Sequence, residues 1–428
     1  MKPRSLKQRW AIAIKAGICA ALLPLLAAVG FAALAASFAL PNDPIRASLL
    51  DRPDDINTRR ASNGRVIDAD TECIGLSVGL YGVEASRSAF YNAAHAKAVF
   101  GCGPFMDYLN GQEPRAYKDY FRYWHGYLVL ARPLLSVLPY ADVRGVYFHI
   151  SLILFLSFLS LIGRDFGLSA ALAFAAPFVV LNALGFWVVA TKAPTFWLAV
   201  SGALFVRSNA LKTGSNHQQA DAWRLPSMVF FFLGAGTAYF DFLTAPALIF
   251  SLTAFVHFLY QRAEMRAREA CLRFALFAGF FALGYAGLWA LKIAIAAALL
   301  DLPVWADVGA AVHDRTRGVS GTVERLTPGL AIWKNFGALK TVWGAVFMLA
   351  FMVAPLVRPS ARIETLALAN RSPGLVLAAL APIVWLELLS NHSQIHAAFT
   401  HLNFAPFAIL SGLALAGPSA PGKTVMPR

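Results

Sequence analysis

The sequence predicts an all-α integral membrane protein with about ten transmembrane helices and a large first outer loop. Its 428 residues are 58% hydrophobic and only 14% charged, whereas a soluble domain is nearer half apolar and about a quarter charged. Several apolar runs approach the roughly 20 residues that a helix needs to cross a bilayer. Much of the lysine and arginine lies in short segments beside these runs, where the positive-inside rule places it.

The formal charge of +14 does not indicate a nucleic-acid partner. The basic residues flank apolar runs and do not form the basic, aromatic-interleaved module that nucleic-acid-binding domains carry. We therefore expect no nucleic acid among the partners. Residues 1–428 are treated as one polytopic domain, because a domain count from length applies to soluble chains.

The first apolar run extends from about Ala11 to Leu40 and follows the basic segment MKPRSLKQRW. It is too long for the core of a signal peptide, so we expect an uncleaved first span, with a cleavable signal as the alternative. Ten spans fit the hydropathy pattern. They lie near 11–39, 144–162, 168–184, 194–207, 226–240, 244–260, 273–298, 341–357, 374–389 and 402–416.

The distribution of basic residues predicts the orientation of these spans. The segments 163–167, 208–225, 261–272 and 358–373 and the C-terminal tail carry arginine and lysine, so they are expected in the cytoplasm with both termini. Two long segments then lie outside, 41–143 and 299–340. Long translocated segments largely escape the positive-inside rule, so their arginines do not contradict this orientation.

Two stretches need a separate interpretation. Residues 126–143 contain Arg132, Pro133 and Pro139, which predicts an interfacial helix on the outer leaflet and not a span. The apolar stretch 168–207 is interrupted by Lys192 and by prolines. These interruptions predict two short spans with a polar outer turn at Lys192, and one long tilted helix is the alternative.

Two of the four cysteines, Cys73 and Cys102, lie in the first outer segment. An oxidising compartment would permit a disulfide between them, and two free thiols are the alternative.

An acidic cluster follows the polar start of the first outer segment. The string VIDADTECIGLSVGLYG places Asp68, Asp70 and Glu72 within five residues. On a strand all three would share a face, whereas on a helix Asp68 and Glu72 would, at i and i+4. Paired carboxylates can share a proton, hold a divalent cation or act as a general base. A solvated acidic turn is the alternative.

Basic and aromatic residues gather in YFRYWHGYLVLARPLL (120–135). Its tyrosines and tryptophan suit the headgroup level, and Arg122, His125 and Arg132 could grip a phosphate. Simple membrane anchoring is the alternative, and it accounts poorly for His125. Lys292 lies inside a span near its end, where it would meet a lipid phosphate or a buried carboxylate, or would snorkel to the interface.

Three further groups of polar residues fall on the outer side. Asp241 of YFDFLTAP would pair with an arginine, cap the next helix or contact a ligand. His313, Arg315 and Arg317 would bind phosphate or form a solvated basic loop. In NHSQIH the spacing of His392 and His396 can bind zinc. Because the stronger H-E-x-x-H signature is absent, hydrogen bonding to a sugar or fixing a turn is favoured.

Three of these strings together resemble motifs of a poorly characterised group of bacterial polytopic membrane proteins. They are YWHGYLVLARPLL (123–135), YFDFLTAP (239–246) and NHSQIHAAFT (391–400). The string IDADTECIGL also resembles the first outer loop of that group, with Glu72 where an aspartate is usual. The whole architecture is similar to that of class C glycosyltransferases, the GT-C fold.

The resemblance implies an enzyme of the bacterial inner membrane that moves a sugar from a polyprenyl-phosphate donor to a glycan, lipid or protein acceptor of the cell envelope. The reaction would take place on the extracytoplasmic face. Asp68 would be the catalytic base, with Glu72 as second choice and a divalent metal ion as a possible assistant. The remaining candidates would contact the membrane-bound substrates. Arg122, Arg132 and Lys292 are assigned to the lipid phosphate, and Asp241, Asn391, His392 and His396 to the sugar or acceptor. Asp70 and His125 are further candidates for substrate binding.

Two other functions are also compatible with the sequence. A transporter or flippase of a lipid-linked or anionic solute would place polar groups near the membrane midplane and often has inverted repeats. The sequence has no visible repeat, and its polar groups cluster on one side. A membrane acyl- or phosphotransferase that uses His392 and His396 is the third possibility, and it would leave the acidic cluster without a role.

Overall fold

The protein is described by a computed structural model. It covers residues 6–57, 68–84, 86–114, 116–213, 224–241, 243, 245–260, 265–316, 318, 327–338 and 372–416. The chain is mostly helical, which confirms the predicted class. The one β-sheet among these residues has two short strands.

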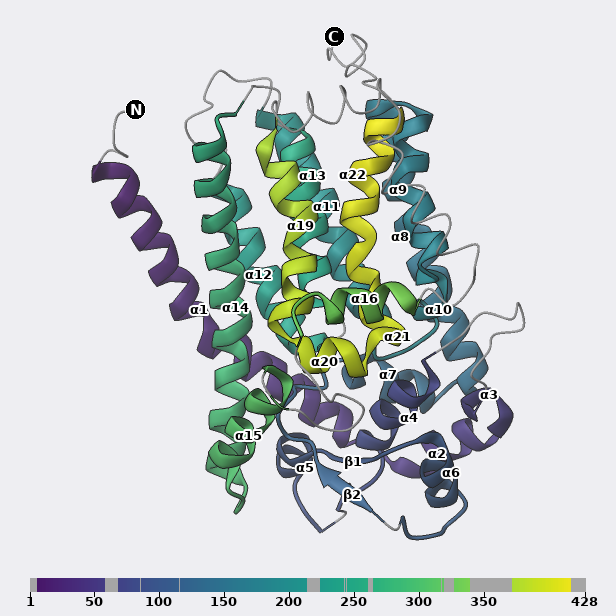
Figure 1. Cartoon of the computed structure of the whole chain (residues 1–428). Helices are drawn as coiled ribbons and strands as arrows, with labels where there is room; N and C mark the ends of the chain where they lie inside the picture. The colour runs from purple at the N-terminus through teal and green to yellow at the C-terminus, as the bar shows by residue number, and fades with distance from the viewer. Residues whose placement is uncertain are drawn as a thin grey trace.

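In the described part of the chain, nine long helices form a bundle (Figure 1). They are α1 (Leu6–Phe38), α8 (Tyr140–Phe166), α9 (Leu168–Val180), α11 (Ala193–Thr213), α12 (Arg224–Phe240), α13 (Pro246–Leu259), α14 (Ala267–Leu299), α19 (Pro373–Leu388) and α22 (Ala405–Ala416). Each overlaps one of the predicted spans. The remaining predicted span, 341–357, lies outside the described residues.

Four stretches of helix in the described part are long and apolar enough to cross a membrane. They are Trp10–Phe38, Tyr140–Phe166, Ala267–Leu299 and Ala397–Leu415. The helices α9, α12, α13 and α19 are apolar but shorter. Helices suit a bilayer because each satisfies its own backbone hydrogen bonds. A membrane protein is therefore supported, while the count of ten crossings stays a prediction.

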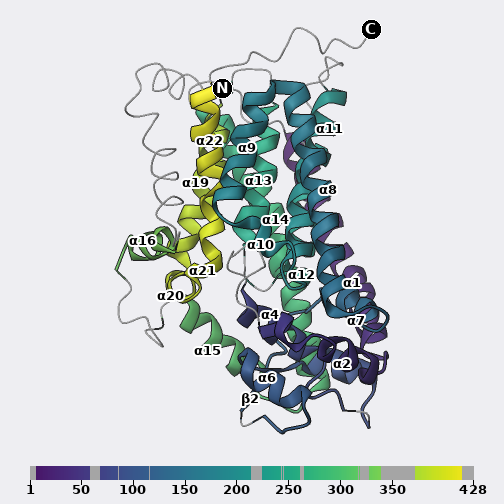
Figure 2. The ribbon, with the colours of Figure 1, turned by 90° about the vertical axis from the view of Figure 1, so that its right-hand side faces the viewer.

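A compact layer of short helices and two strands lies at one end of the bundle (Figures 1 and 2). We call it the cap, and it comprises the described residues between 42 and 135. It contains α2 (Asn42–Leu50), α3 (Pro53–Asn57), α4 (Ala69–Val78), α5 (Ala89–His95), β1 (Lys97–Val99), α6 (Cys102–Leu109), β2 (Tyr117–Asp119) and α7 (Leu128–Leu135). The two strands are antiparallel, with Lys97 opposite Asp119.

Short helices lie between the bundle and the cap (Figure 2). They are α10 (Ala183–Phe186), α16 (Leu330–Gly337), α20 (Ser390–Ile395), α21 (Ala397–Thr400) and the 3₁₀ helix η2 (His401–Phe404). A further helix, α15 (Val304–Thr316), runs from the end of α14 past the cap toward α20 (Figure 1). These breaks in regular structure position the polar side chains described below.

The structure corrects one predicted element and confirms another. Residues 126–143 are not one interfacial helix, because α7 ends at Leu135 and α8 begins at Tyr140, directly after Pro139. Proline suits a position at the start of a helix, where its missing N–H is no loss. The split of 168–207 is confirmed, since α9 and α11 are separate helices with Lys192 in the turn between them.

A disulfide joins Cys73 of α4 to Cys102 of α6, with 5.1 Å between the Cα atoms. The alternative of two free thiols is thereby wrong. Both cysteines are buried in the cap. The bond ties the helix that carries the acidic cluster to the rest of the cap.

Removing this disulfide is expected to destabilise the protein by about 2–4 kcal/mol, because the unfolded chain gains freedom when the loop opens. The double variant Cys73→Ala, Cys102→Ala should therefore melt at a lower temperature than the parent in detergent. Cys271→Ala is the matched control, because Cys271 is a free, exposed cysteine. Equal melting temperatures for the two variants would contradict the expectation.

Candidate functional site

The N-terminus of α4 presents two carboxylates to the same neighbour. Asp68 is the N-cap residue, and its Oδ1 accepts a hydrogen bond from the backbone N of Thr71 at 3.2 Å. Glu72 follows one turn later and is buried. Both carboxylates contact the turn 190–192, whereas Asp70 is exposed. The helical alternative for the acidic cluster is therefore correct.

Asp68 forms a close ion pair with Lys192. The lysine is 3% exposed, and its ammonium lies 4.4 Å from the ring centre of Phe186 and 4.2 Å from that of Phe399. Aromatic faces attract cations most strongly when water is excluded. Asp68 is the more accessible partner, with 14% of its side chain exposed.

The ion pair determines the charge state of Asp68. Burial opposes ionisation of this carboxyl, but the Lys192 ammonium and the hydrogen bonds from Lys192 and Thr71 outweigh burial and lower its pKa below the usual 3.8. Asp68 is therefore a carboxylate at neutral pH. An ionised, partly accessible carboxylate can accept a proton from a hydroxyl.

Glu72 holds the turn that carries Lys192. Its carboxylate accepts hydrogen bonds from the backbone N of Ala190 at 3.0 Å, from the backbone N and Oγ1 of Thr191 at 3.4 Å each, and from Oη of Tyr140 at 3.2 Å. Burial raises the pKa of Glu72, although the hydrogen bonds from these donors act to lower it. With its oxygens engaged and solvent excluded, Glu72 is better suited to position Lys192 than to act as the base.

The two histidines of NHSQIH lie side by side, with 4.6 Å between ring centres. His392 Nε2 hydrogen-bonds to the carbonyl of Leu243 at 3.0 Å, and Asn391 Nδ2 donates to the carbonyl of Gly318 at 2.5 Å. Burial lowers the pKa of His396 to about 4, although the charge of Asp68 opposes this shift and those of Lys192 and Arg315 assist it. His396 is therefore neutral at pH 7 and within electrostatic reach of all three.

Two further charged residues face the same region. Arg315, in the last turn of α15, donates from Nη2 to Oη of Tyr123 at 2.7 Å, and its charge acts on both histidines. Asp241 follows α12, is buried, and its charge acts on Lys192. It does not cap α13, whose N-cap is Ala245 without a side-chain bond. Thr244 and Arg317 lie outside the described residues.

We call this group the central cluster. It comprises Asp68, Lys192, Asp241, Arg315, His392 and His396. Its members come from five segments that are far apart in the chain. The sequence predicted no site role for Lys192, whereas Arg315 was one of three basic residues expected to bind phosphate or to form a solvated loop. An isolated lysine inside the apolar stretch 168–207 was the available signal for Lys192, because charges at membrane depth are rare and usually functional.

Arg132, assigned above to a lipid phosphate, is instead saturated by protein acceptors. It is 1% exposed and donates to the carbonyls of Ser37 at 2.8 Å and Leu40 at 2.7 Å, to the carbonyl of Gly79, and to Oδ1 of Asn42 at 3.1 Å. These contacts join the ends of α1 and α4. They favour a structural role for Arg132.

Three of the other residues assigned to substrate are also held by the protein. Lys292 is buried and donates to the carbonyls of Ala93 at 3.0 Å and Ala94 at 2.9 Å. His125 has a left-handed backbone, φ 58°, and its Nε2 hydrogen-bonds to the carbonyl of Tyr120 at 2.9 Å. Arg122 forms an ion pair with Asp307. These contacts favour scaffolding roles for Lys292 and His125.

Replacing Arg132 with methionine is expected to destabilise the protein by about 1–3 kcal/mol, because buried carbonyl oxygens lose their donor. Thermal unfolding in detergent measures the change. Arg87→Met is the matched control, because Arg87 is exposed and pairs with an exposed glutamate, a contact worth about 0–1 kcal/mol. A stable Arg132→Met protein with weakened binding of a polyprenyl phosphate would restore the phosphate assignment.

The described residues do not offer a metal site. No three histidine, cysteine, aspartate or glutamate side chains within them lie together in a way that could hold an ion. The central cluster also contains two cations, which disfavour a third beside them. The donor set therefore does not fit the divalent metal that the resemblance implies.

No protein-family model, curated protein or solved structure matches this chain. The central cluster combines an ionised carboxylate, two neutral imidazoles and two cations at the junction of bundle and cap. Together these groups can accept a proton, hydrogen-bond to hydroxyls and stabilise an anion.

Proposed function

We propose that the chain is an integral-membrane glycosyltransferase that moves a sugar from a polyprenyl-phosphate donor to an acceptor of the cell envelope. The observation that carries the proposal is the ion pair of Asp68 and Lys192 beside Arg315 and neutral His396. When a hydroxyl displaces a phosphate, a base can take the proton of the hydroxyl and cations can stabilise the leaving phosphate. The proposal includes a GT-C-like fold with ten crossings.

The chemistry follows from this arrangement. Asp68 takes the proton of the acceptor hydroxyl while the hydroxyl oxygen bonds to the anomeric carbon of the sugar. The bond from that carbon to the phosphate oxygen breaks, and the phosphate leaves with the electron pair. Lys192 and Arg315 stabilise the leaving phosphate, in place of Arg132 and Lys292. His392, His396 and Asp241 orient the sugar or acceptor through hydrogen bonds.

The orientation is part of the same proposal. The ends of α1 at Leu6 and of α22 at Ala416 lie at the same end of the bundle, opposite the cap (Figure 1). An even number of crossings would give this arrangement. With both termini in the cytoplasm, the cap and the central cluster belong to the extracytoplasmic face of a bacterial inner membrane, an oxidising side that suits the disulfide.

The test is a transfer assay with the purified protein in proteoliposomes. Polyprenyl-phosphate carriers of radiolabelled hexoses, N-acetylhexosamines and pentoses are mixed with envelope fractions from cells that lack the gene. Label leaving the lipid fraction for a glycan, lipid or protein product supports the proposal. Movement of the labelled lipid across the bilayer without any covalent product would instead identify a flippase and contradict it.

A further inference from the structure

Two cavities lie on either side of β2 in the cap. The first has a volume of about 510 Å³ and is lined by Phe100, Asp107, Gln112 and Glu113, among others. The second, of about 440 Å³, lies between β2 and α15. Tyr117 and Lys118 line both. Each volume is within the range of about 300–1,000 Å³ that is usual for small-molecule sites. We call the two cavities together the β2 groove.

The β2 groove shares one residue, Arg315, with the central cluster. Its second cavity is bounded by Arg122, Asp307 and Arg315. Arg315 is also a member of the central cluster, since its charge acts on His392 and His396. The Arg122–Asp307 ion pair fixes this wall by joining the cap to α15. A molecule that fills the second cavity therefore contacts Arg315, one of the residues of the proposed reaction.

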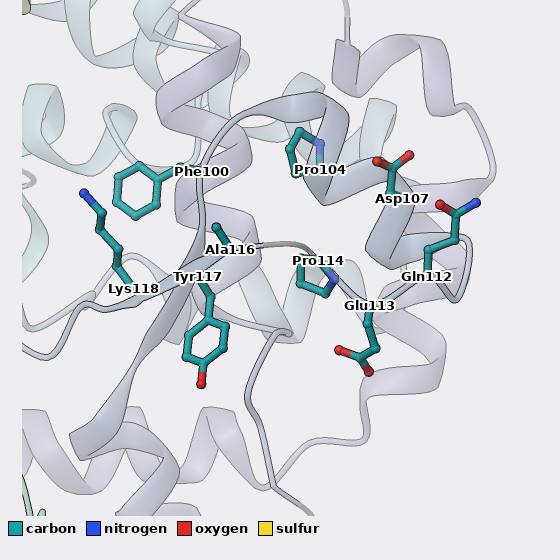
Figure 3. Close-up of a pocket in the computed structure, with 9 residues that line it drawn as sticks. All are labelled: Phe100, Pro104, Asp107, Gln112, Glu113, Pro114, Ala116, Tyr117 and Lys118. Carbon is teal, nitrogen blue, oxygen red and sulfur yellow. The ribbon is translucent and has the colours of Figure 1, made fainter. Parts of the chain in front are cut away.

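The lining suits a sugar chain. Phe100 and Tyr117 are 39% and 51% exposed, and Lys118 lies 5.2 Å from the centre of the Phe100 ring. Figure 3 shows Phe100 and Lys118 on one side of the first cavity and Asp107, Gln112 and Glu113 on the other. The C–H face of a sugar ring packs on an exposed aromatic ring, and its hydroxyls bond to carboxylate, amide and ammonium groups.

The charge of the lining disfavours other occupants. Carboxylates outnumber cationic groups among the described residues that line the two cavities. A polyanion such as a phosphate-rich polymer would be repelled by them. Charged side chains dominate the lining of the second cavity, which therefore offers little to an acyl chain. A neutral glycan is not repelled by the carboxylates, and its hydroxyls can bond to the polar groups of the lining.

We propose that the β2 groove binds a neutral oligosaccharide and that this chain is the acceptor, which the groove leads toward Asp68. The binding of the glycan stands on the groove itself, while its use as acceptor rests on the proposed function. In this arrangement Tyr117 and Phe100 hold inner sugars of the chain. The terminal hydroxyl passes Arg315 to reach the base.

Direct binding tests the inference separately from transfer. The full protein in nanodiscs is titrated with four fluorescent probes: a neutral glucose hexasaccharide, a neutral N-acetylglucosamine hexasaccharide, a galacturonate hexasaccharide and an uncharged decapeptide. We expect binding of at least one neutral hexasaccharide, weakened about tenfold or more by Tyr117→Ala. Glu113→Gln, which keeps the shape of the loop, should weaken it several-fold. Phe90→Ala is the control, since Phe90 is an exposed aromatic residue of the cap that lines neither cavity.

The outcomes separate the two proposals. If the Asp68→Asn variant still binds a neutral glycan but no longer transfers sugar, both the glycan-binding inference and the proposed function are supported. If the protein binds a neutral hexasaccharide in the groove but transfers no sugar from any donor, the glycan-binding inference stands and the proposed function is contradicted. The protein could transfer sugar yet bind neither neutral hexasaccharide, or bind them equally in all the variants. Either result would overturn the glycan-binding inference and leave the proposed function standing. Binding of only the peptide or only the galacturonate chain would also overturn it.

Discussion

Replacing Asp68 with asparagine is expected to slow sugar transfer by about 10²–10⁴-fold, the usual contribution of a general base. Asparagine is an equally good N-cap residue, so the bond to Thr71 N and the start of α4 are retained. What is lost is the negative charge that accepts the proton and that also pairs with the buried Lys192. The initial rate of label transfer from a polyprenyl-phosphate sugar, at saturating acceptor, measures the effect.

Asp51→Asn is the control for this experiment. Asp51 is an exposed aspartate of the cap beside Arg52, so transfer should continue at the parental rate. The melting temperature of each variant separates a chemical defect from unfolding. Full activity of a folded Asp68→Asn protein would remove Asp68 from the role of base.

Replacing Lys192 with methionine is expected to destabilise the protein by about 3–5 kcal/mol, because breaking a buried ion pair leaves the remaining charge without compensation. The pair contributes stability above the pKa of Asp68 in the unfolded chain, about 3.9. This contribution is lost as the pH falls through the lower pKa in the folded state. The cost of the substitution should therefore be full at pH 7 and shrink below about pH 4.

The same substitution should shift the pH dependence of transfer. Without the ammonium, burial is the dominant influence on Asp68 and raises its pKa. Because only the carboxylate acts as base, the acid limb of the kcat/KM profile should move to higher pH, which a merely structural lysine would not cause. Lys212→Met, at the exposed end of α11, should change stability by less than about 0.5 kcal/mol. An unshifted profile in Lys192→Met would show that Lys192 does not set the charge of Asp68.

The positions of the helices were predictable from the sequence. Nine of the ten predicted ranges contain a long helix in the described part of the chain. The break at Lys192 was also visible, because an isolated charge interrupts the apolar run. The boundary at Pro139 was misplaced, since hydropathy does not change where α8 begins.

The roles of the charged residues were less predictable. Arg132 and Lys292 have the chemistry of a phosphate site, yet their donors meet backbone carbonyls. Whether a cation faces a ligand or a helix end depends on packing and not on residue type. Glu72 was the second choice as base, but its oxygens are held by the turn 190–191.

The sequence by itself determined that this is a mostly helical chain with apolar helices that suit a membrane. Hydropathy is a local property, and a helix makes its backbone hydrogen bonds within its own segment, so each segment can be assigned without the rest of the chain. It also singled out Asp68, Asp241, His392 and His396. Only the tertiary structure decided which charges meet. Asp68 and Lys192 are 124 residues apart in the chain, and the contact forms because the buried carboxylate of Glu72 fixes the turn beside α4. Such pairings depend on distances between separate elements, which no local pattern contains.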